Sequence, residues 1–272
     1  MVVRSPAINV MAGAALKAAR ALKRDFGEVE QLQVSVKGPG DFVSTADLRA
    51  EKVLRTELGK ARPGYGFLGE EGGRQEGSDK THCWIVDPLD GTTNFLHGIP
   101  QFCISIGLER DSELVAGVIY EPIRDEMFWA EKGQGAYVND RRLRVSARRQ
   151  LSESVIATGI PTIRGSVDRD LYVRTLVAVM GATVGVRRFG AAALDLAYVA
   201  AGRVDGFWEF GLQPWDMAAG ILLIREAGGY ISGLRDGKHD VMASGDVVAA
   251  NDHLHLPLTA LLKDAMKAAG TT

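Results

Sequence analysis

The sequence predicts an α/β protein in which layers of helices and sheets alternate. Three observations support this prediction. The chain opens with an amphipathic helical pattern, residues 103–138 show one strand pattern after another, and strand and helix patterns alternate from residue 155 onward. Such alternation is typical of sheets that are covered by helices.

Composition limits the classes of protein that are possible. The 272 residues are 46% hydrophobic, which is enough to bury a substantial core. The net charge of −2 gives no general reason to expect nucleic acid or an acidic membrane as a partner. Cys83 and Cys103 are the two cysteines, and both lie in apolar runs, so we expect reduced thiols in a cytoplasmic protein. No apolar run approaches the ~20 residues of a membrane span, so we expect no membrane contact.

The first elements are two helices separated by a loop. The apolar residues of the first helix fall on one face, and Ser5 with Pro6 gives a start signal. These apolar residues are Ile8, Met11, Ala12, Ala15, Leu16, Ala19 and Leu22. Residues 37–47 are expected to form a loop, and a second helical pattern follows. Ser44, Thr45 and Asp47 have a simple alternative interpretation as helix caps.

Two short strands each end in acidic residues. Residues 66–69 form a strand pattern that ends at Glu70, although paired glutamates before glycines are usually just a solvated turn. Residues 83–86 form a buried strand pattern that ends at Asp87 and Asp90. Residues 91–94 then indicate a helix start, whose free N–H groups attract an anion. Cation ligands and an anion site within eight residues suggest a meeting place of metal and phosphate; a surface Asx-turn is the alternative.

The middle of the chain predicts an antiparallel sheet with strands at 103–108, 114–120, 126–130 and 136–138. A basic cluster follows it, at Arg141, Arg142, Arg144, Arg148 and Arg149. A solvated surface is the ordinary interpretation, and a patch that binds RNA or an acidic protein is the alternative. The second half alternates strands at 155–158, 183–188, 204–209, 230–232 and 247–250 with helices at 168–180, 191–201, 215–227 and 253–269. We expect two halves, 1–150 and 151–272, packed as one compact unit.

A further acid, Asp216, opens the apolar helix at 215–227, where on its own it would be only a helix cap. Together with Glu70, Asp87 and Asp90 it makes four carboxylates at the ends of regular elements. Four carboxylates cannot all stay ionised at one place without a compensating positive charge, because repulsion between their negative charges favours protonation. Divalent cations resolve the conflict, and oxygen ligands favour Mg²⁺ over Zn²⁺. The five histidines are scattered and show no zinc spacing.

Residues 84–95 and 215–229 resemble the two signature segments of the inositol monophosphatase family of Mg²⁺-dependent, lithium-sensitive phosphatases. The resemblance extends over nearly the whole chain, from Lys37 to Gly229, and residues 188–206 are most similar to the bacterial SuhB-type branch. It implies an αβαβα five-layer sandwich and a homodimer.

The resemblance also implies roles for individual residues. Two to three Mg²⁺ ions per subunit would be held by Glu70, Asp87, the carbonyl of Leu89, Asp90 and Asp216. Thr92 with Asp47 would orient and deprotonate the attacking water, and Glu70 would assist through water. Phosphate and substrate hydroxyls would contact Asp90, Gly91, Thr92, Ala192 and Glu209. Lys37 would supply a movable charge near the site.

The function that the resemblance implies is hydrolysis of a small polyol or sugar phosphate, with myo-inositol 1-phosphate as the leading substrate. Histidinol phosphate, a nucleotide 3′-phosphate and fructose 1,6-bisphosphate are alternatives within the same chemistry. A regulatory role in RNA transcription complexes is an alternative of another class, and the SuhB resemblance suggests it. Ala191 departs from relatives that carry Thr or Ser at this position, which leaves substrate preference open.

Overall fold

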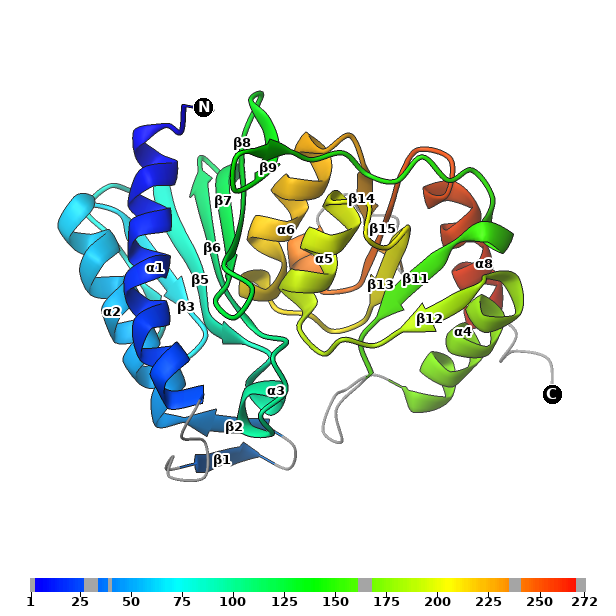
Figure 1. Ribbon diagram of the computed structural model, residues 1–272, viewed down its shortest axis with the longest axis horizontal. Coiled ribbons are helices and arrows are strands. Elements are labelled where there is room, and N and C mark those ends of the chain that lie inside the picture. The colour runs from blue at the N-terminus through cyan, green and yellow to red at the C-terminus, as the bar shows by residue number, and fades with distance from the viewer. Residues whose placement is uncertain (1–2, 27–33, 39–40, 161–167, 235–240, 268–272) are drawn as a thin grey trace.

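Helices and sheets alternate across the long axis of the molecule (Figure 1). The structure, a computed structural model, describes residues 3–26, 34–38, 41–160, 168–234 and 241–267, and only the backbone of 34–38 and 41–44. From one end to the other, the layers are α1 with α2, a first sheet, α5 with α6, a second sheet, and α4 with α8. The expected five-layer α/β sandwich is thus confirmed. The helices are α1 (Pro6–Phe26), α2 (Thr45–Ala61), α3 (Thr92–Leu96), α4 (Arg169–Ala182), α5 (Ala192–Ala200), α6 (Pro214–Glu226), α7 (Val241–Ser244) and α8 (His255–Lys267).

The first sheet has eight strands in the order β10-β9-β8-β7-β6-β5-β3-β4. The neighbours from β5 to β9 are antiparallel, as the middle of the sequence predicts, whereas β3 and β5 are parallel. The strands are β3 (Gly66–Gly69), β4 (Gly73–Gln75), β5 (His82–Asp90), β6 (Cys103–Arg110), β7 (Glu113–Glu121), β8 (Glu126–Glu131), β9 (Gly135–Val138) and β10 (Arg141–Arg142).

The second sheet has five strands in the order β12-β11-β13-β15-β14. Its strand β11 is parallel to both of its neighbours, so the ends of β11 and β13 meet at one edge. The strands are β11 (Val155–Thr158), β12 (Gly185–Arg187), β13 (Gly206–Glu209), β14 (Tyr230–Ser232) and β15 (Val247–Ala250). All strands of this sheet come after residue 150, but the division into two halves stays a prediction.

Three apolar clusters hold the layers together. The first buries α1 and α2 against the first sheet, through residues such as Leu22, Leu54 and Trp84. The second fills the space between the sheets with α5 and α6, and the third packs α4 and α8 on the second sheet. Burial of each helix's apolar face drives this stacking. The predicted face of α1 is buried apart from Leu16, which is 42% exposed.

Two local predictions are wrong. The segment expected to be a loop at residues 37–47 includes the end of β1 (Val34–Gly38) and all of β2 (Asp41–Ser44), which pair in antiparallel fashion. Helix α2 begins at Thr45, so Asp47 lies in its first turn. Strand β5 does not end at Val86 but continues through Asp87 to Asp90. None of the helices in the described part of the chain has the length and apolar character needed to cross a membrane.

Candidate active site

The ends of two parallel strands bring Glu70 and Asp87 to one edge of the first sheet. Gly69, the last residue of β3, pairs with Val86 of β5. Glu70 follows directly and donates its N–H to the carbonyl of Val86 at 3.2 Å. Because both strands run in the same direction, Glu70 comes to lie beside Asp87, the next residue of β5.

An irregularity in β5 turns its last residues away from regular pairing. Asp87 pairs with Ser105 and Asp90 with Cys103, so the register with β6 shifts between the two acids. The Asp87 carboxylate accepts the N–H of Leu89 at 2.9 Å, which stabilises the irregular segment. Irregularities of this kind often re-aim side chains at functional sites.

Thr92 links the end of β5 to helix α2. Its hydroxyl lies 2.9 Å from Oδ1 of Asp47 and 3.0 Å from the carbonyl of Leu89, and it has one proton for these two acceptors. Asp47 is fully buried. The two residues predicted to act together on water are therefore in contact, although they are 45 positions apart.

Asp90 faces the N-terminus of α5. Its two carboxylate oxygens accept the N–H groups of Ala192 at 3.2 Å and Ala193 at 2.8 Å. Free N–H groups and the helix dipole at this end favour a negative charge. The thiol of Cys103 lies 3.6 Å from the same carboxylate. Two of the residues predicted to contact substrate, Asp90 and Ala192, thus bond to each other.

Asp216 and Glu209 come from the second half of the chain. Asp216 lies in the first turn of α6, and its Oδ2 accepts the N–H of Gln213 at 2.7 Å in a capping box. The interpretation of Asp216 as a cap therefore holds, whatever further role it has. Glu209 is the last residue of β13. Its carboxylate lies so close to the backbone of Gly159 that a Cβ added to Gly159 would overlap it.

Burial and mutual repulsion shift the pKa values of these acids upward. Burial raises the pKa of Asp87 well above its usual range, and three neighbouring carboxylates add to the rise: those of Glu70, Asp90 and Asp216. Burial likewise raises the pKa of Asp216 well above its usual range, with Asp90 as the next cause. The pKa of Asp90 rises to about 6 through burial, which the N–H groups of α5 oppose. The pKa of Glu209 rises to about 8 through burial and the charge of Asp90, against the opposing charge of Arg188.

The donor set fits a hard divalent cation. Each of these acids offers oxygen ligands only. Burial and the neighbouring carboxylates raise the pKa values of Asp87 and Asp216, and a hard divalent cation would relieve that repulsion. Within the described ranges, no three His, Cys, Asp or Glu side chains are already gathered around one point as an ion requires. The case for a cation site therefore depends on the chemistry of these oxygen donors. Binding of a cation would have to draw their carboxylates closer together.

Two further acids were not predicted from the sequence as part of this region. Asp195 of α5 is 1% exposed, and neither carboxylate oxygen has a hydrogen-bond partner among the described residues. Burial, then the charges of Glu209 and Asp90, raises its pKa well above the usual range. An acid inside the apolar stretch 193–201 is the sequence signal for it. Glu51 of α2 is treated below. The predicted Lys37 lies on β1, and its side chain is outside the described residues.

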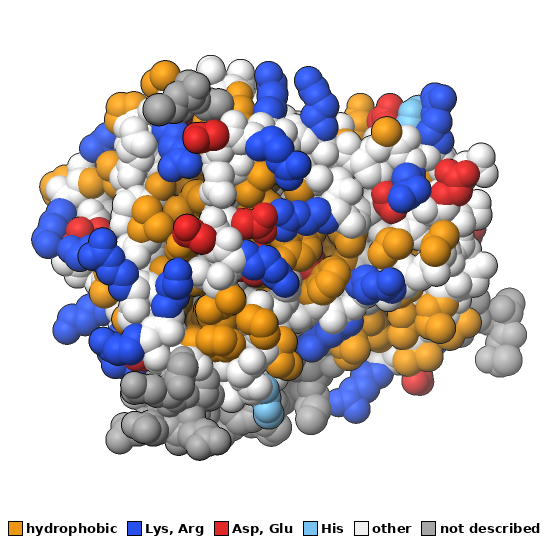
Figure 2. All heavy atoms as spheres, in the orientation of Figure 1, with side chains coloured by type: hydrophobic (Ala, Val, Ile, Leu, Met, Phe, Trp, Pro, Cys, Tyr) orange, Lys and Arg blue, Asp and Glu red, His pale blue; other side chains and the backbone are white. Residues whose placement is uncertain are grey.

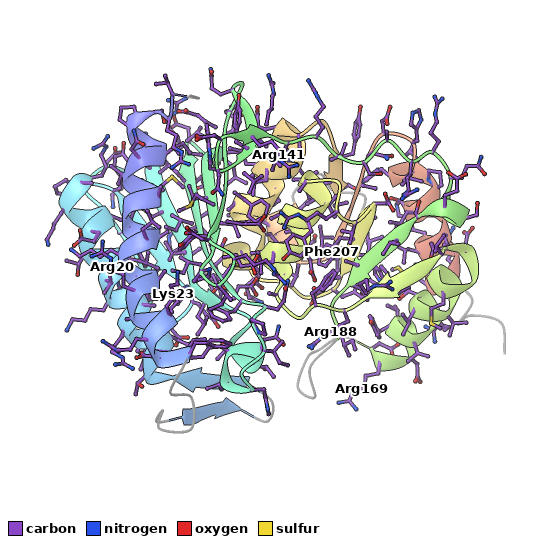
Figure 3. All side chains as sticks on the ribbon, viewed as in Figure 1. Arg20, Lys23, Arg141, Arg169, Arg188 and Phe207 are labelled. Carbon is purple, nitrogen blue, oxygen red and sulfur yellow. The ribbon has the colours of Figure 1, made fainter. Side chains whose placement is uncertain are left out.

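The basic cluster at residues 141–149 comprises β10 and the segment that follows it. All five of its arginines are exposed, and Figure 2 shows Lys and Arg side chains along the upper edge of the molecule and over α1. Figure 3 labels Arg141 in the upper part of the molecule and Arg188 below the centre, so these two arginines are separate. Arg148 is paired with Asp205 at 3.3 Å.

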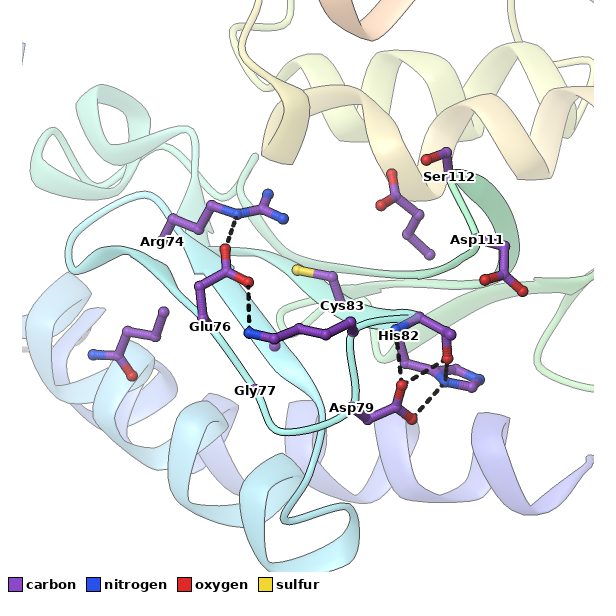
Figure 4. Close-up of a pocket in the computed structure, with 13 residues that line it drawn as sticks. Arg74, Glu76, Gly77, Asp79, His82, Cys83, Asp111 and Ser112 are labelled. Carbon is purple, nitrogen blue, oxygen red and sulfur yellow. Dashed lines mark hydrogen bonds and ion pairs between the residues drawn. The ribbon is translucent and has the colours of Figure 1, made fainter.

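A polar hollow of about 430 Å³ lies at the other end of β5, beside His82 and Cys83 (Figure 4). Among the residues that line it, Arg74 pairs with Glu76 at 2.8 Å, and Nδ1 of His82 lies 2.9 Å from the carboxylate of Asp79. Since this hollow adjoins the start of β5, whereas Asp87 and Asp90 lie in its last residues, it is not part of the candidate site.

Comparison with known proteins gives one consistent result. A model of the inositol monophosphatase family matches residues 4–267. The chain is 57% identical to an inositol-1-monophosphatase of Mesorhizobium japonicum, over 97% of this chain and 99% of that protein. It is 44% identical to the Nus factor SuhB of Pseudomonas aeruginosa, over 90% and 92% of the two chains. The crystal structure of the extragenic suppressor protein suhB from Bartonella henselae superposes with a TM-score of 0.92 at 57% identity, covering 95% of this chain and 99% of that one.

Proposed function

The chain belongs to the inositol monophosphatase family, and we propose that it is a Mg²⁺-dependent phosphatase that hydrolyses myo-inositol 1-phosphate to inositol and phosphate. The observation that carries the proposal is the 57% identity, over nearly the full length, to an inositol-1-monophosphatase. The acids at the ends of β3, β5 and α6 agree with it, because a phosphate ester needs its charge neutralised before water can attack.

Two to three Mg²⁺ ions would be held by oxygen ligands from both halves of the chain. These ligands are Glu70, Asp87, the carbonyl of Leu89, Asp90 and Asp216. When bound, the cations supply charge neutralisation at the phosphoryl oxygens and lower the pKa of water. With the cations bound, the carboxylates can all be ionised, which repulsion prevents in the protein alone.

Thr92 and Asp47 would move the proton. The Thr92 oxygen accepts a proton from the attacking water as its own proton passes along the 2.9 Å contact to Asp47. Asp47 is fully buried and so is kept from exchanging that proton with solvent. The N–H groups of Gly91 and Thr92 would orient the phosphate at the start of α3, and Glu70 would assist through a water molecule.

The substrate hydroxyls would meet Asp90, the backbone of Ala192, and Glu209. A carboxyl group whose pKa lies at about 8 is mostly protonated at neutral pH, so Glu209 can both donate to and accept from a polyol hydroxyl. A hydroxyl contact at Glu209 favours an ester with free hydroxyls, such as inositol 1-phosphate, over histidinol phosphate, which has none. Ala191, the residue before Ala192, has no side-chain hydroxyl that could contact the substrate.

A panel of these four phosphate esters, assayed with Mg²⁺ and again with EDTA, tests the proposal. We expect phosphate release from inositol 1-phosphate to have the highest kcat/KM and to vanish with EDTA. We expect Asp87→Asn to lose about a thousandfold or more in kcat while keeping its circular dichroism spectrum, because it removes a ligand. Wild-type activity in Asp87→Asn, or equal turnover in EDTA, would refute the proposed site.

A regulatory role in transcription complexes is the second candidate, and the exposed arginines at 141–149 favour it. A relative 44% identical to this chain is named a Nus factor. If binding is the cellular role, Asp87→Asn will restore growth to a deletion strain, and Arg141→Glu combined with Arg144→Glu will not. The reverse result would assign the cellular role to catalysis. For either role we expect a homodimer in the cytoplasm, and both the oligomeric state and the localisation remain predictions.

A further inference from the structure

One face of helix α2 carries a row of polar residues that points toward the candidate site. Asp47, Glu51 and Arg55 are four positions apart and so lie on the same side of the helix. Asp47 contacts Thr92, as described above. Glu51 is only 4% exposed, which is rare for a glutamate that has no specific partners.

Both carboxylate oxygens of Glu51 are engaged. Oε2 accepts the N–H of Glu71 at 2.8 Å, and Oε1 accepts from the guanidinium of Arg55 at 2.6 Å. That guanidinium lies 4.9 Å above the ring of Phe67 in β3. The buried charge of Glu51 is thus compensated, and Glu51 binds the backbone of the segment that follows β3.

The backbone around Glu70 closes tightly on this pair. A Cβ on Gly69 would come within 2.5 Å of Oε2 of Glu51, and a Cβ on Gly72 would overlap the guanidinium of Arg55. Glu70 itself is bonded through its N–H to Val86. The two peptide groups on either side of Glu70 are therefore fixed, one by β5 and one by α2.

We propose that Glu51, held by Arg55, is a positioning residue that fixes the backbone at Glu70–Glu71 and so aims the Glu70 carboxylate at the metal site. The inference rests on the proposed function, in which Glu70 is a Mg²⁺ ligand. Glu51 touches neither metal nor substrate and acts only through the backbone. Residues that orient metal ligands in this way typically contribute 10–100-fold to affinity for the ion.

The test is Mg²⁺ binding without substrate, measured by calorimetry, on Glu51→Ala and Glu51→Gln. We expect Glu51→Ala to weaken Mg²⁺ binding by about 10–100-fold. Amide exchange at residues 69–72 of the metal-free variant should rise while exchange in the core strands stays unchanged. Gln keeps one acceptor oxygen and should recover part of the affinity, so Glu51→Gln keeps the test usable if the alanine variant does not fold. At saturating Mg²⁺ the kcat of both variants should return close to that of the wild type.

Glu57→Gln is the matched control, because Glu57 lies on the same helix but pairs with Lys17 at the surface. It should bind Mg²⁺ as the wild type does. Unchanged Mg²⁺ affinity in Glu51→Ala, together with faster exchange at residues 69–72, would overturn the inference and leave Glu51 a purely structural role. Glu70→Gln separates the two proposals: if it binds Mg²⁺ normally, the proposed ligand set fails independently of Glu51.

Discussion

Single side chains in the candidate site are held by elements that are distant in the sequence. Asp90 is bound by the first turn of α5, more than a hundred positions away, and Thr92 by Asp47 of α2. The types and positions of these acids are visible in the sequence. Their partners are not, because hydrogen bonds across such separations depend on the packing of the whole fold.

Thr92→Val tests the proton path at this scale. It keeps the branched shape and removes the hydroxyl that contacts Asp47, so kcat should fall by about 10²–10⁴-fold. Mg²⁺ affinity measured by calorimetry should stay near that of the wild type. Thr92→Ser keeps the hydroxyl and should retain most of the activity; a valine variant as active as the serine variant would exclude Thr92 from proton transfer.

Gly159→Ala tests the role of Glu209 without changing Glu209. The added methyl group would displace the Glu209 carboxyl group, so KM for inositol 1-phosphate should rise about tenfold, or ~1.4 kcal/mol, the size of one hydrogen bond. KM for p-nitrophenyl phosphate, which has no polyol hydroxyls, should change little. Gly181→Ala is the control, since a Cβ there meets nothing within 4 Å. An equal rise in KM for both substrates would contradict a polyol contact.

The limits of sequence interpretation are also visible among single residues. Asp195 and Glu51 are buried charged residues in helices whose other residues follow ordinary patterns. Asp195 stands out only as an acid within the apolar stretch 193–201, and nothing in spacing or residue type distinguishes Glu51 from a surface acid. Only the positions of Asp90, Glu209 and Glu71 around them reveal what they do.

At the scale of elements, the sequence predicts most helices and strands correctly but misjudges where β5 ends. Asp87 and Pro88 read as the end of a strand, because both residue types are disfavoured inside sheets. The strand continues because a register shift lets Asp90 pair again with Cys103. The hairpin of β1 and β2 was missed because the glycines and proline at 38–40 read as a long loop.

Helix α4 provides a test of stability that should leave chemistry untouched. Asp168 caps this helix by accepting the N–H of Asp170 at 2.9 Å and that of Leu171 at 3.3 Å. Asp168→Ala should therefore lower the free energy of unfolding by about 1 kcal/mol, measured with urea, and leave kcat/KM unchanged. Asp168→Asn can still cap and should be nearly as stable as the wild type. A loss of activity in the alanine variant would mean that α4 contributes to the site.

At the scale of the whole molecule, the acids make metal-free stability depend on pH. Their folded pKa values lie above those of the unfolded chain, so the folded state binds protons more tightly. The stability they contribute is full below the unfolded values near pH 4 and is lost as pH rises through about 6 for Asp90 and about 8 for Glu209. In EDTA, the free energy of unfolding should therefore fall between about pH 4 and pH 8, and less steeply in Asp87→Asn.

Mg²⁺ should reverse this loss, because an ion that binds only the folded state stabilises it by mass action. The gain in the urea midpoint on adding Mg²⁺ should be larger at pH 8 than at pH 6, since protons compete with the ion for the same carboxylates. The Glu57→Gln control should behave as the wild type does. A gain independent of pH would contradict binding at these acids.

The layered architecture could be predicted in part. Alternating patterns predict helices covering sheets, but the five-layer order came from the family resemblance and not from periodicity. The strand order β12-β11-β13-β15-β14 could not be read from the sequence, since it depends on pairings between segments that are not neighbours in the chain. The proximity of Asp216 to Asp90 and Glu70 of the first half could not be read from the sequence either.

The central claim is that acids from separate elements bind a group of cations together. X-ray diffraction from crystals grown with Mn²⁺ tests this most directly, because Mn²⁺ scatters anomalously and accepts the oxygen ligands that Mg²⁺ prefers. We predict at least two anomalous peaks, with Glu70, Asp87, Asp90 and Asp216 each placing an oxygen within about 2–2.5 Å of one of them. Peaks found only elsewhere, or coordinated by Asp87 and Asp90 with Glu70 and Asp216 remaining apart, would contradict the account.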